Sequence, residues 1–136
     1  DRIVADTVQR RRGQVDVVAG IEARGFILGA MIAHELGVGF VPVRKAGKLP
    51  AAVHSQSYTL EYGEATLEIH QDAVNHRERV LVVDDVLATG GTLAATCELV
   101  KRCGASVAGV ELVLEIGALG GRSRLTEYDL HCLVTV

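Results

Sequence analysis

The sequence lacks the features that define several large classes of protein. No apolar run approaches the length that crosses a lipid bilayer, so we expect no membrane contact. The net charge of −3 at pH 7 gives none of the basic surplus typical of proteins that bind nucleic acids. Internal repeats, low-complexity tracts and interdomain linkers are also absent. We therefore expect residues 1–136 to form a single domain with one core.

Cysteine and histidine are too few and too scattered to indicate a metal centre. Cys97, Cys103 and Cys132 make an odd count without the spacing of a zinc site, so we expect reduced packing residues of a cytoplasmic protein. The five histidines lack the paired spacing of metal ligands. No nucleophile elbow indicates serine or cysteine catalysis. The 15 glycines are abundant instead, which favours a compact α/β protein with loops built from backbone.

The most informative stretch, VLVVDDVLATGGTL, runs from Val80 to Leu93. Its apolar start predicts a buried strand, two carboxylates mark the carboxyl end of that strand, and a short loop then opens a helix to about Cys103. Ligands of open α/β sheets bind at this edge. Glycine N–H groups, hydroxyls and the start of a helix together make a phosphate cradle. The residues that supply these groups are Thr89, Gly90, Gly91 and Thr92.

The two carboxylates, Asp84 and Asp85, cannot face a phosphate. They suit the hydroxyls of a diol, which donate hydrogen bonds to carboxylates, or a metal ion. A phosphate and a diol held by one strand, loop and helix describe a ribose 5-phosphate. The signatures of P-loops and dinucleotide folds are both missing. A plain tight turn is the alternative, but two carboxylates ending an apolar strand cost desolvation unless they have partners.

Positive charge gathers at two other predicted strand ends. The interval from Leu36 to Leu60 contains no acidic residue, and Arg44, Lys45 and Lys48 follow a predicted strand there. Such clustering concentrates positive potential where a polyanion binds. An ordinary solvated loop would usually mix the two signs. Arg24, in a loop at the end of the preceding strand, marks a second anion position.

The order of the expected elements indicates an α/β fold with a parallel-centred sheet flanked by helices. The first helix ends near Arg10–Arg12, which we expect to be solvated. The helix at 27–36 is apolar on most faces, so we expect it to be buried. A hairpin around Gly63 and the small residues before it predict a flexible lid at about 45–70. Further elements are expected as strands at 15–19, 39–43, 106–114 and 131–136, and as a short helical segment at 117–121.

Five segments together resemble one family. Residues 82–92 are similar to the 5-phosphoribosyl-1-diphosphate (PRPP) signature of type I phosphoribosyltransferases. The segments EARGF, VPVRKAGKLP, YTLEYG and LEI, which start at residues 22, 41, 58 and 67, resemble adenine phosphoribosyltransferases in their proper order. The resemblance implies the type I phosphoribosyltransferase fold with its protruding hairpin. It also implies transfer of the phosphoribosyl group from PRPP to adenine, giving AMP and diphosphate in purine salvage, with Mg²⁺ and a homodimer.

The resemblance also assigns roles to single residues. Asp84 and Asp85 would hold the ribose hydroxyls, with Mg²⁺ nearby bound mainly through PRPP and water rather than by direct metal ligands. Glu61 would assist proton movement at the base. The 5-phosphate would contact Ala88, Thr89, Gly90, Gly91 and Thr92. The diphosphate would meet Ala23, Arg24, Arg44, Lys45 and Lys48, with Arg44 acting across a dimer interface as in relatives. The base would contact Phe26 and Ile116.

One departure from the family pattern concerns the base. Family members have an additional N-terminal segment that covers the base, and we expect this sequence to be truncated before it. Two alternatives therefore stay open: an enzyme of the same fold that uses another base, and a regulator that senses PRPP or nucleotide without catalysis. A receiver domain also begins with two acids after a strand, but its phosphoacceptor would lie on a later strand, and the only later aspartate is Asp129.

Overall fold

The computed structural model describes residues 2–50, 52–60 and 63–136. Helices and strands alternate along most of the chain, as the sequence predicts. The elements are α1 (Arg2–Arg11), β1 (Val17–Ile21), α2 (Arg24–Leu36), β2 (Gly39–Lys45), β3 (Val53–Leu60), β4 (Gly63–His70), β5 (Arg79–Val83), β6 (Val86–Leu87), α3 (Gly91–Arg102), β7 (Ser106–Glu115), the short 3₁₀ helices η1 (Gly117–Leu119) and η2 (Gly121–Arg124), and β8 (Leu130–Thr135).

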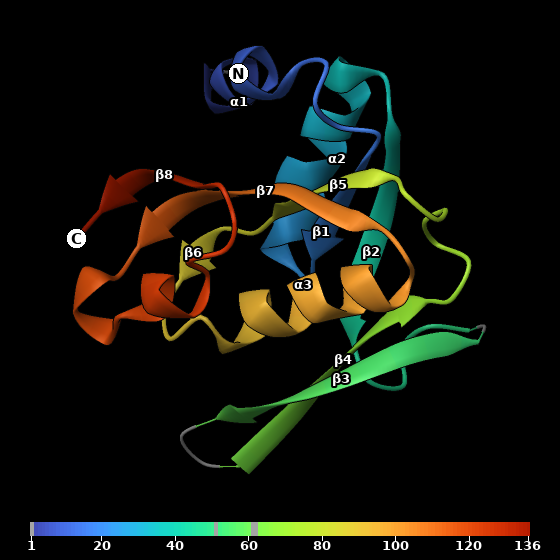
Figure 1. Ribbon diagram of the computed structural model, residues 1–136. Coiled ribbons are helices and arrows are strands. Elements are labelled where there is room, and N and C mark those ends of the chain that lie inside the picture. The colour runs from blue at the N-terminus through green and yellow to red at the C-terminus, as the bar shows by residue number, and fades with distance from the viewer. Residues whose placement is uncertain (1, 51, 61–62) are drawn as a thin grey trace.

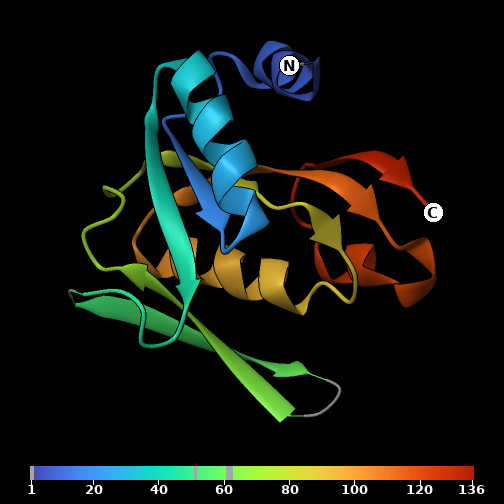
Figure 2. The same cartoon turned by 180° about the vertical axis from the view of Figure 1, so that it is seen from behind.

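One sheet with the order β3-β4-β2-β1-β5-β7-β6 organises the molecule, and β8 pairs with β7. Its centre is parallel, whereas β4 pairs antiparallel with β2 and β3. α3 covers one face of the sheet, and α1 and α2 lie on the other (Figures 1 and 2). The predicted α/β fold with a parallel-centred sheet is confirmed.

The central strand β5 contributes to both faces because successive side chains of a strand point in opposite directions. Val80 and Val82 join the core under α3, while Leu81 and Val83 join the core under α1 and α2. All four are fully buried. This double burial explains why every position from Val80 to Val83 is apolar, and it fixes where the strand's carboxyl end lies.

The helix α2 differs from the prediction that it is buried. It presents Gly25, Gly29, Ile32 and Ala33 to the sheet, but Ile27 is 69% exposed and Met31 is 40% exposed. A helix on the outer face of a sheet buries one stripe, and α1 covers only part of the rest. The apolar composition of α2 therefore did not predict which of its side chains are buried.

The end of α1 also differs from the prediction. Arg11 is 1% exposed, and its guanidinium donates to Glu111 and Asp129 at 2.8 Å each. Arg10 shares Glu111 through a 2.7 Å bond, whereas Arg12 is exposed. The expected solvated terminus is thus wrong for Arg11, because β7 carries a buried carboxylate that needs a partner.

The hairpin β3–β4 is confirmed, with its base built into the sheet. Leu67 and Ile69 on β4 belong to the core, and β3 lies along α3, where Arg102 donates to the carbonyl of Ser55. The hairpin then extends away from the sheet (Figure 1). Glu61 lies outside the described residues. No helix in the parts of the chain that the structure describes is long and apolar enough to cross a membrane.

Candidate active site at the strand ends

The neighbouring strands β1 and β5 end side by side and bring two of the predicted loops together. They pair in parallel with Gly20 opposite Val83, so the loop after Ile21 lies next to Asp84. A Cβ at Gly25 would stand 2.9 Å from the carbonyl oxygen of Val83 and 3.3 Å from Oδ1 of Asp84. Only glycine allows α2 to begin this close to the neighbouring strand end.

The predicted phosphate cradle forms a small hollow of about 80 Å³ at the start of α3, lined by Asp84 and residues 86–93. Gly90 precedes the helix with φ +89, a conformation that glycine adopts readily. No side-chain oxygen among the described residues caps α3. Its first N–H groups therefore stay available for an anion, aided by the positive end of the helix dipole.

The two aspartates after β5 have different environments. Asp84 is 8% exposed, and its Oδ1 accepts the N–H of Asp85 at 2.8 Å. Burial raises the pKa of the Asp84 carboxyl to about 7. Asp85 is more open, and its Oδ2 forms an ion pair with Nε of Arg24 at 2.7 Å. This ion pair joins the loop after β1 to the loop after β5, so Arg24 lies beside Asp85 at the carboxyl end of β5.

The remaining cations gather around Glu22. Its carboxylate accepts Nζ of Lys48 at 2.7 Å, Nε of Arg44 at 3.3 Å and the backbone N–H of Lys45 at 3.0 Å. Chiefly because of the hydrogen bond from Lys48, the pKa of the Glu22 carboxyl falls to about 2. Arg44 also lies 5.7 Å from the ring centroid of Phe26, in a cation–π contact.

Three predicted residues lie at the margin of this arrangement. Phe26 packs edge to face on Phe40 with ring centroids 6.1 Å apart. Ile116 donates its N–H to the carbonyl of Leu87, which lines the cradle, at 2.9 Å. Lys45 is exposed. The structure thus joins Arg24, Arg44 and Lys48 to the strand ends, whereas the assigned base contacts stay predictions.

Sequence reasoning assigned no role to two residues of the site. Glu22 organises the cations, although the sequence shows only a carboxylate two residues before Arg24. Gly121 packs against the cradle: a Cβ there would clash with the carbonyl oxygen of Ala88, and a Cβ at Gly90 would stand 2.7 Å from the carbonyl oxygen of Gly121. The adjacent glycines at 120–121 are the sequence signal of this close approach, but the sequence pattern predicts only a short helical segment at 117–121.

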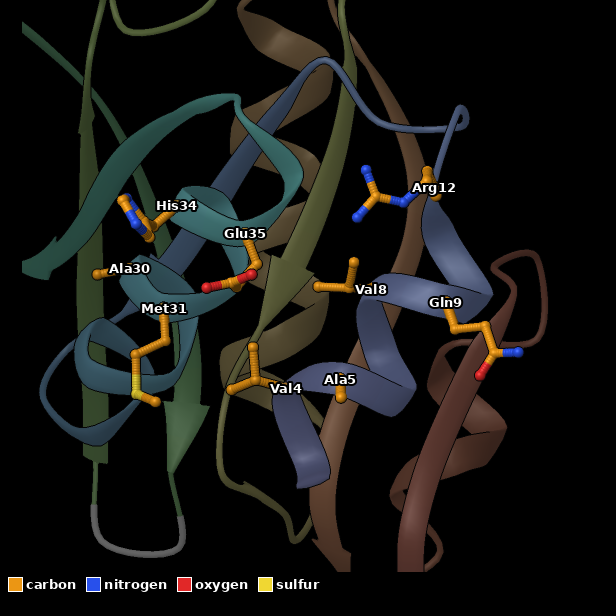
Figure 3. A pocket seen from close by; sticks show the side chains of 9 residues that line it. All are labelled: Val4, Ala5, Val8, Gln9, Arg12, Ala30, Met31, His34 and Glu35. Atoms are coloured by element: carbon orange, nitrogen blue, oxygen red, sulfur yellow. The ribbon is translucent and has the colours of Figure 1, made fainter. Parts of the chain in front are cut away.

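A cavity larger than the cradle lies elsewhere, between α1 and α2, with a volume of about 880 Å³. Figure 3 shows Val4, Val8 and Met31 beside it, with Arg12 and Glu35 among its polar residues. It lacks the strand ends and the backbone cradle that phosphate recognition requires. The residues of the predicted phosphate cradle line the small hollow and not this groove.

The donor set fits a magnesium ion that a substrate carries. Within residues 2–50, 52–60 and 63–136, no group of three or more His, Cys, Asp or Glu side chains is arranged to hold a metal ion. Mg²⁺ in phosphate-transfer sites is often held by one or two carboxylates together with substrate phosphates and water. Asp84 and Asp85, adjacent at the strand end, match that requirement.

The chain is similar to known proteins both in sequence and in structure. A model of the phosphoribosyl transferase domain matches residues 1–134. The adenine phosphoribosyltransferase of Thermoanaerobacter pseudethanolicus has a similar crystal structure, with a TM-score of 0.95 and 46% identity over 99% of this chain and 79% of that one. The chain therefore has the type I phosphoribosyltransferase fold.

Relatives with high sequence identity show which branch of the family the chain belongs to. The adenine phosphoribosyltransferase of Salinispora tropica is 61% identical over 99% of this chain and 73% of its own length. The Trypanosoma brucei adenine phosphoribosyltransferase, solved with AMP, pyrophosphate and ribose-5-phosphate, has a TM-score of 0.91 and 34% identity over 98% of this chain and 63% of its own. This chain belongs to the adenine phosphoribosyltransferase branch of that family.

Proposed function

We propose that this chain transfers the 5-phosphoribosyl group of PRPP to adenine, giving AMP and diphosphate in purine salvage. The observation that carries the proposal is the 2.7 Å ion pair between Arg24 and Asp85. It unites a cradle for a ribose 5-phosphate with the loop after β1, where Glu22 accepts hydrogen bonds from Arg44 and Lys48. A sugar phosphate on one side and a diphosphate on the other are the two halves of PRPP.

The chemistry follows from where charge develops. As the anomeric C–O bond breaks, diphosphate leaves with the electron pair and positive charge grows on the ribose. A ring nitrogen of adenine then bonds to the anomeric carbon and loses its proton. Arg24, Arg44 and Lys48 would stabilise the departing diphosphate, and such preorganised charges are often the largest catalytic contribution. Asp84 and Asp85 would hold the ribose hydroxyls, which fixes the reacting carbon.

The base half of the site rests on the resemblance. Glu61 would move the proton at the base, and the hairpin that carries it would close over the substrates and exclude water. Phe26 and Ile116 would contact the adenine ring. Mg²⁺ bound to PRPP, with Asp84 and Asp85 nearby, would neutralise charge on the leaving group.

The assembly and location belong to the same proposal. A homodimer is supported by the exposed apolar side chains of Ile27 and Met31 on α2, which a second copy would cover. Light scattering should then give twice the chain mass, and Met31→Glu should give the monomer. Cys97, Cys103 and Cys132 are free thiols, as suits the reducing cytoplasm.

The decisive experiment supplies PRPP and Mg²⁺ with adenine, guanine, hypoxanthine or orotate separately and follows nucleotide formation. AMP as the sole product supports the proposal. Another nucleotide would identify a different base, and binding of PRPP without any product would indicate a regulator. The role of Glu61 is tested separately by Glu61→Gln, which we expect to lower turnover at saturating substrates by ~10²-fold or more.

A further inference from the structure

Glu22 is the point where the proposed diphosphate cations meet in the absence of ligand. Its side chain is 10% exposed, and its two oxygens accept Lys48 Nζ at 2.7 Å and Arg44 Nε at 3.3 Å. The same carboxylate accepts the N–H of Lys45 at 3.0 Å. The carboxylate of Glu22 is therefore ion-paired with Arg44 and Lys48, two of the cations proposed to bind diphosphate.

We propose that Glu22 is a positioning residue that acts as a built-in counter-anion: it holds Arg44 and Lys48 until diphosphate replaces it, and so sets how tightly diphosphate binds. This inference rests on the proposed function, because it requires the cations to contact diphosphate. The ligand must break the contacts of Arg44 and Lys48 with Glu22 before it can use both cations. The free energy of diphosphate binding is then the difference between the contacts that the ligand forms and the contacts with Glu22 that it breaks.

The environment of Glu22 supports this exchange. The depressed pKa of its carboxyl means that Glu22 stays ionised throughout the neutral range, so its negative charge always opposes an arriving anion. Lys48 is half exposed and lies on the loop after β2, which places its ammonium within reach of both the carboxylate and solvent. The pairs are partly solvated, so each contributes modestly and can be exchanged.

The test removes the charge and keeps the shape. In Glu22→Gln the amide oxygen can still accept the N–H of Lys45, while the charge that holds Arg44 and Lys48 is lost. We expect inorganic diphosphate to bind about 3–10-fold more tightly by calorimetry without Mg²⁺. Ribose 5-phosphate, which needs only the cradle, should bind within about twofold of the wild type. In turnover assays the KM for PRPP should fall while the KM for adenine stays constant.

Glu68→Gln is the matched control. Glu68 lies on the neighbouring β4 and accepts the N–H of Gly47 at 2.8 Å and the hydroxyl of Ser55 at 3.1 Å. Within the described residues Glu68 forms no ion pair. The substitution makes the same charge change near the same loop, so it should alter diphosphate binding less than twofold. An equal tightening in both variants would show a general charge effect and overturn the proposal.

The remaining outcomes are also decisive. Unchanged or weaker diphosphate binding in Glu22→Gln overturns the role of Glu22 as a competitor. If the wild type binds neither diphosphate nor ribose 5-phosphate, the proposed function itself fails. Circular dichroism checks folding. Should Glu22→Gln unfold, Glu22→Asp keeps the charge but draws it back from Lys48, and a smaller tightening of about twofold is expected, with no tightening counting against the proposal.

Discussion

The two halves of the site differ in the groups that form them: one consists of backbone and the other of side chains. The phosphate cradle at 88–92 consists of backbone, lies between a buried strand and a helix, and is supported by Gly121. The cation half at 22–48 consists of long side chains, and the Arg24 side chain is 80% exposed. The cradle is therefore preorganised by the fold itself, whereas the cations are held by ion pairs with the carboxylates of Glu22 and Asp85. Damage to the cradle should affect folding and binding together, and damage to the cations should affect binding alone.

The largest effect is expected from Gly90→Ala, which attacks the cradle. The new methyl group would stand 2.7 Å from the carbonyl oxygen of Gly121, and the residue would keep a positive φ. We expect activity to fall by about 100-fold or more and the free energy of unfolding to fall by about 2–4 kcal/mol. Gly47→Ala is the control, because φ there is +86 but nothing lies within 4 Å. Equal losses in both variants would show that only backbone strain matters.

Arg24→Met attacks the other half and should separate binding from stability. Because the Arg24 side chain is so exposed, we expect the free energy of unfolding to change by less than about 0.5 kcal/mol. Loss of a charged contact to the leaving group should lower kcat/KM for PRPP by about 10–50-fold. Chemical denaturation and steady-state kinetics on the same preparations measure both quantities. A clear fall in the free energy of unfolding would show that Arg24 also stabilises the fold, so that binding and stability are not separate in the cation half.

Asp84 should make the cradle half sensitive to pH. Ribose hydroxyls donate to the ionised carboxylate, so binding must remove the proton that Asp84 holds below its raised pKa of about 7. Ribose 5-phosphate should therefore bind about 10-fold more tightly at pH 8 than at pH 6. Asp84→Asn should flatten this profile, which also controls for titration of the phosphate. The same pH dependence in the wild type and in Asp84→Asn would show that a group other than Asp84 titrates.

The same carboxyl should affect stability in the opposite direction. Between about pH 4 and pH 7 folded Asp84 keeps a proton that the unfolded chain has lost, so the free energy of unfolding should fall as pH rises through this window. Asp84→Asn should therefore stabilise the ligand-free protein at pH 8 by about 1–3 kcal/mol while weakening ligand binding. Thermal unfolding at pH 5 and pH 8 measures the difference. A destabilised variant at pH 8 would contradict burial as the cause of the shift.

The smallest effect is expected from Lys45→Met. The side chain is exposed and contributes long-range attraction, while the backbone N–H that bonds Glu22 stays in place. We expect kcat/KM for PRPP to fall about 2–3-fold at low salt and to match the wild type near 0.5 M salt, where screening is strong. A loss that persists at high salt would place Lys45 in direct contact with the ligand.

The sequence by itself determined the parts of this protein that depend on local pattern. Continuous apolar residues at 80–83 predicted a buried strand, and the acids and glycines after it predicted a ligand site at its carboxyl end. The cation cluster after Gly39–Val43 was visible for the same reason. Each conclusion needed only neighbours in the chain, because strand burial, turn formation and the start of a helix are local properties.

Only the tertiary structure decided which distant groups become partners. Nothing near Arg11 in the sequence indicates that it is buried between Glu111 and Asp129, roughly a hundred residues away. In the same way, Glu22 meets Arg44 and Lys48, and Gly121 closes against Gly90, because parallel pairing brings remote strand ends and loops to one edge of the sheet. Side-chain charge is encoded locally, but its neutralisation depends on contacts across the fold, which no local pattern specifies.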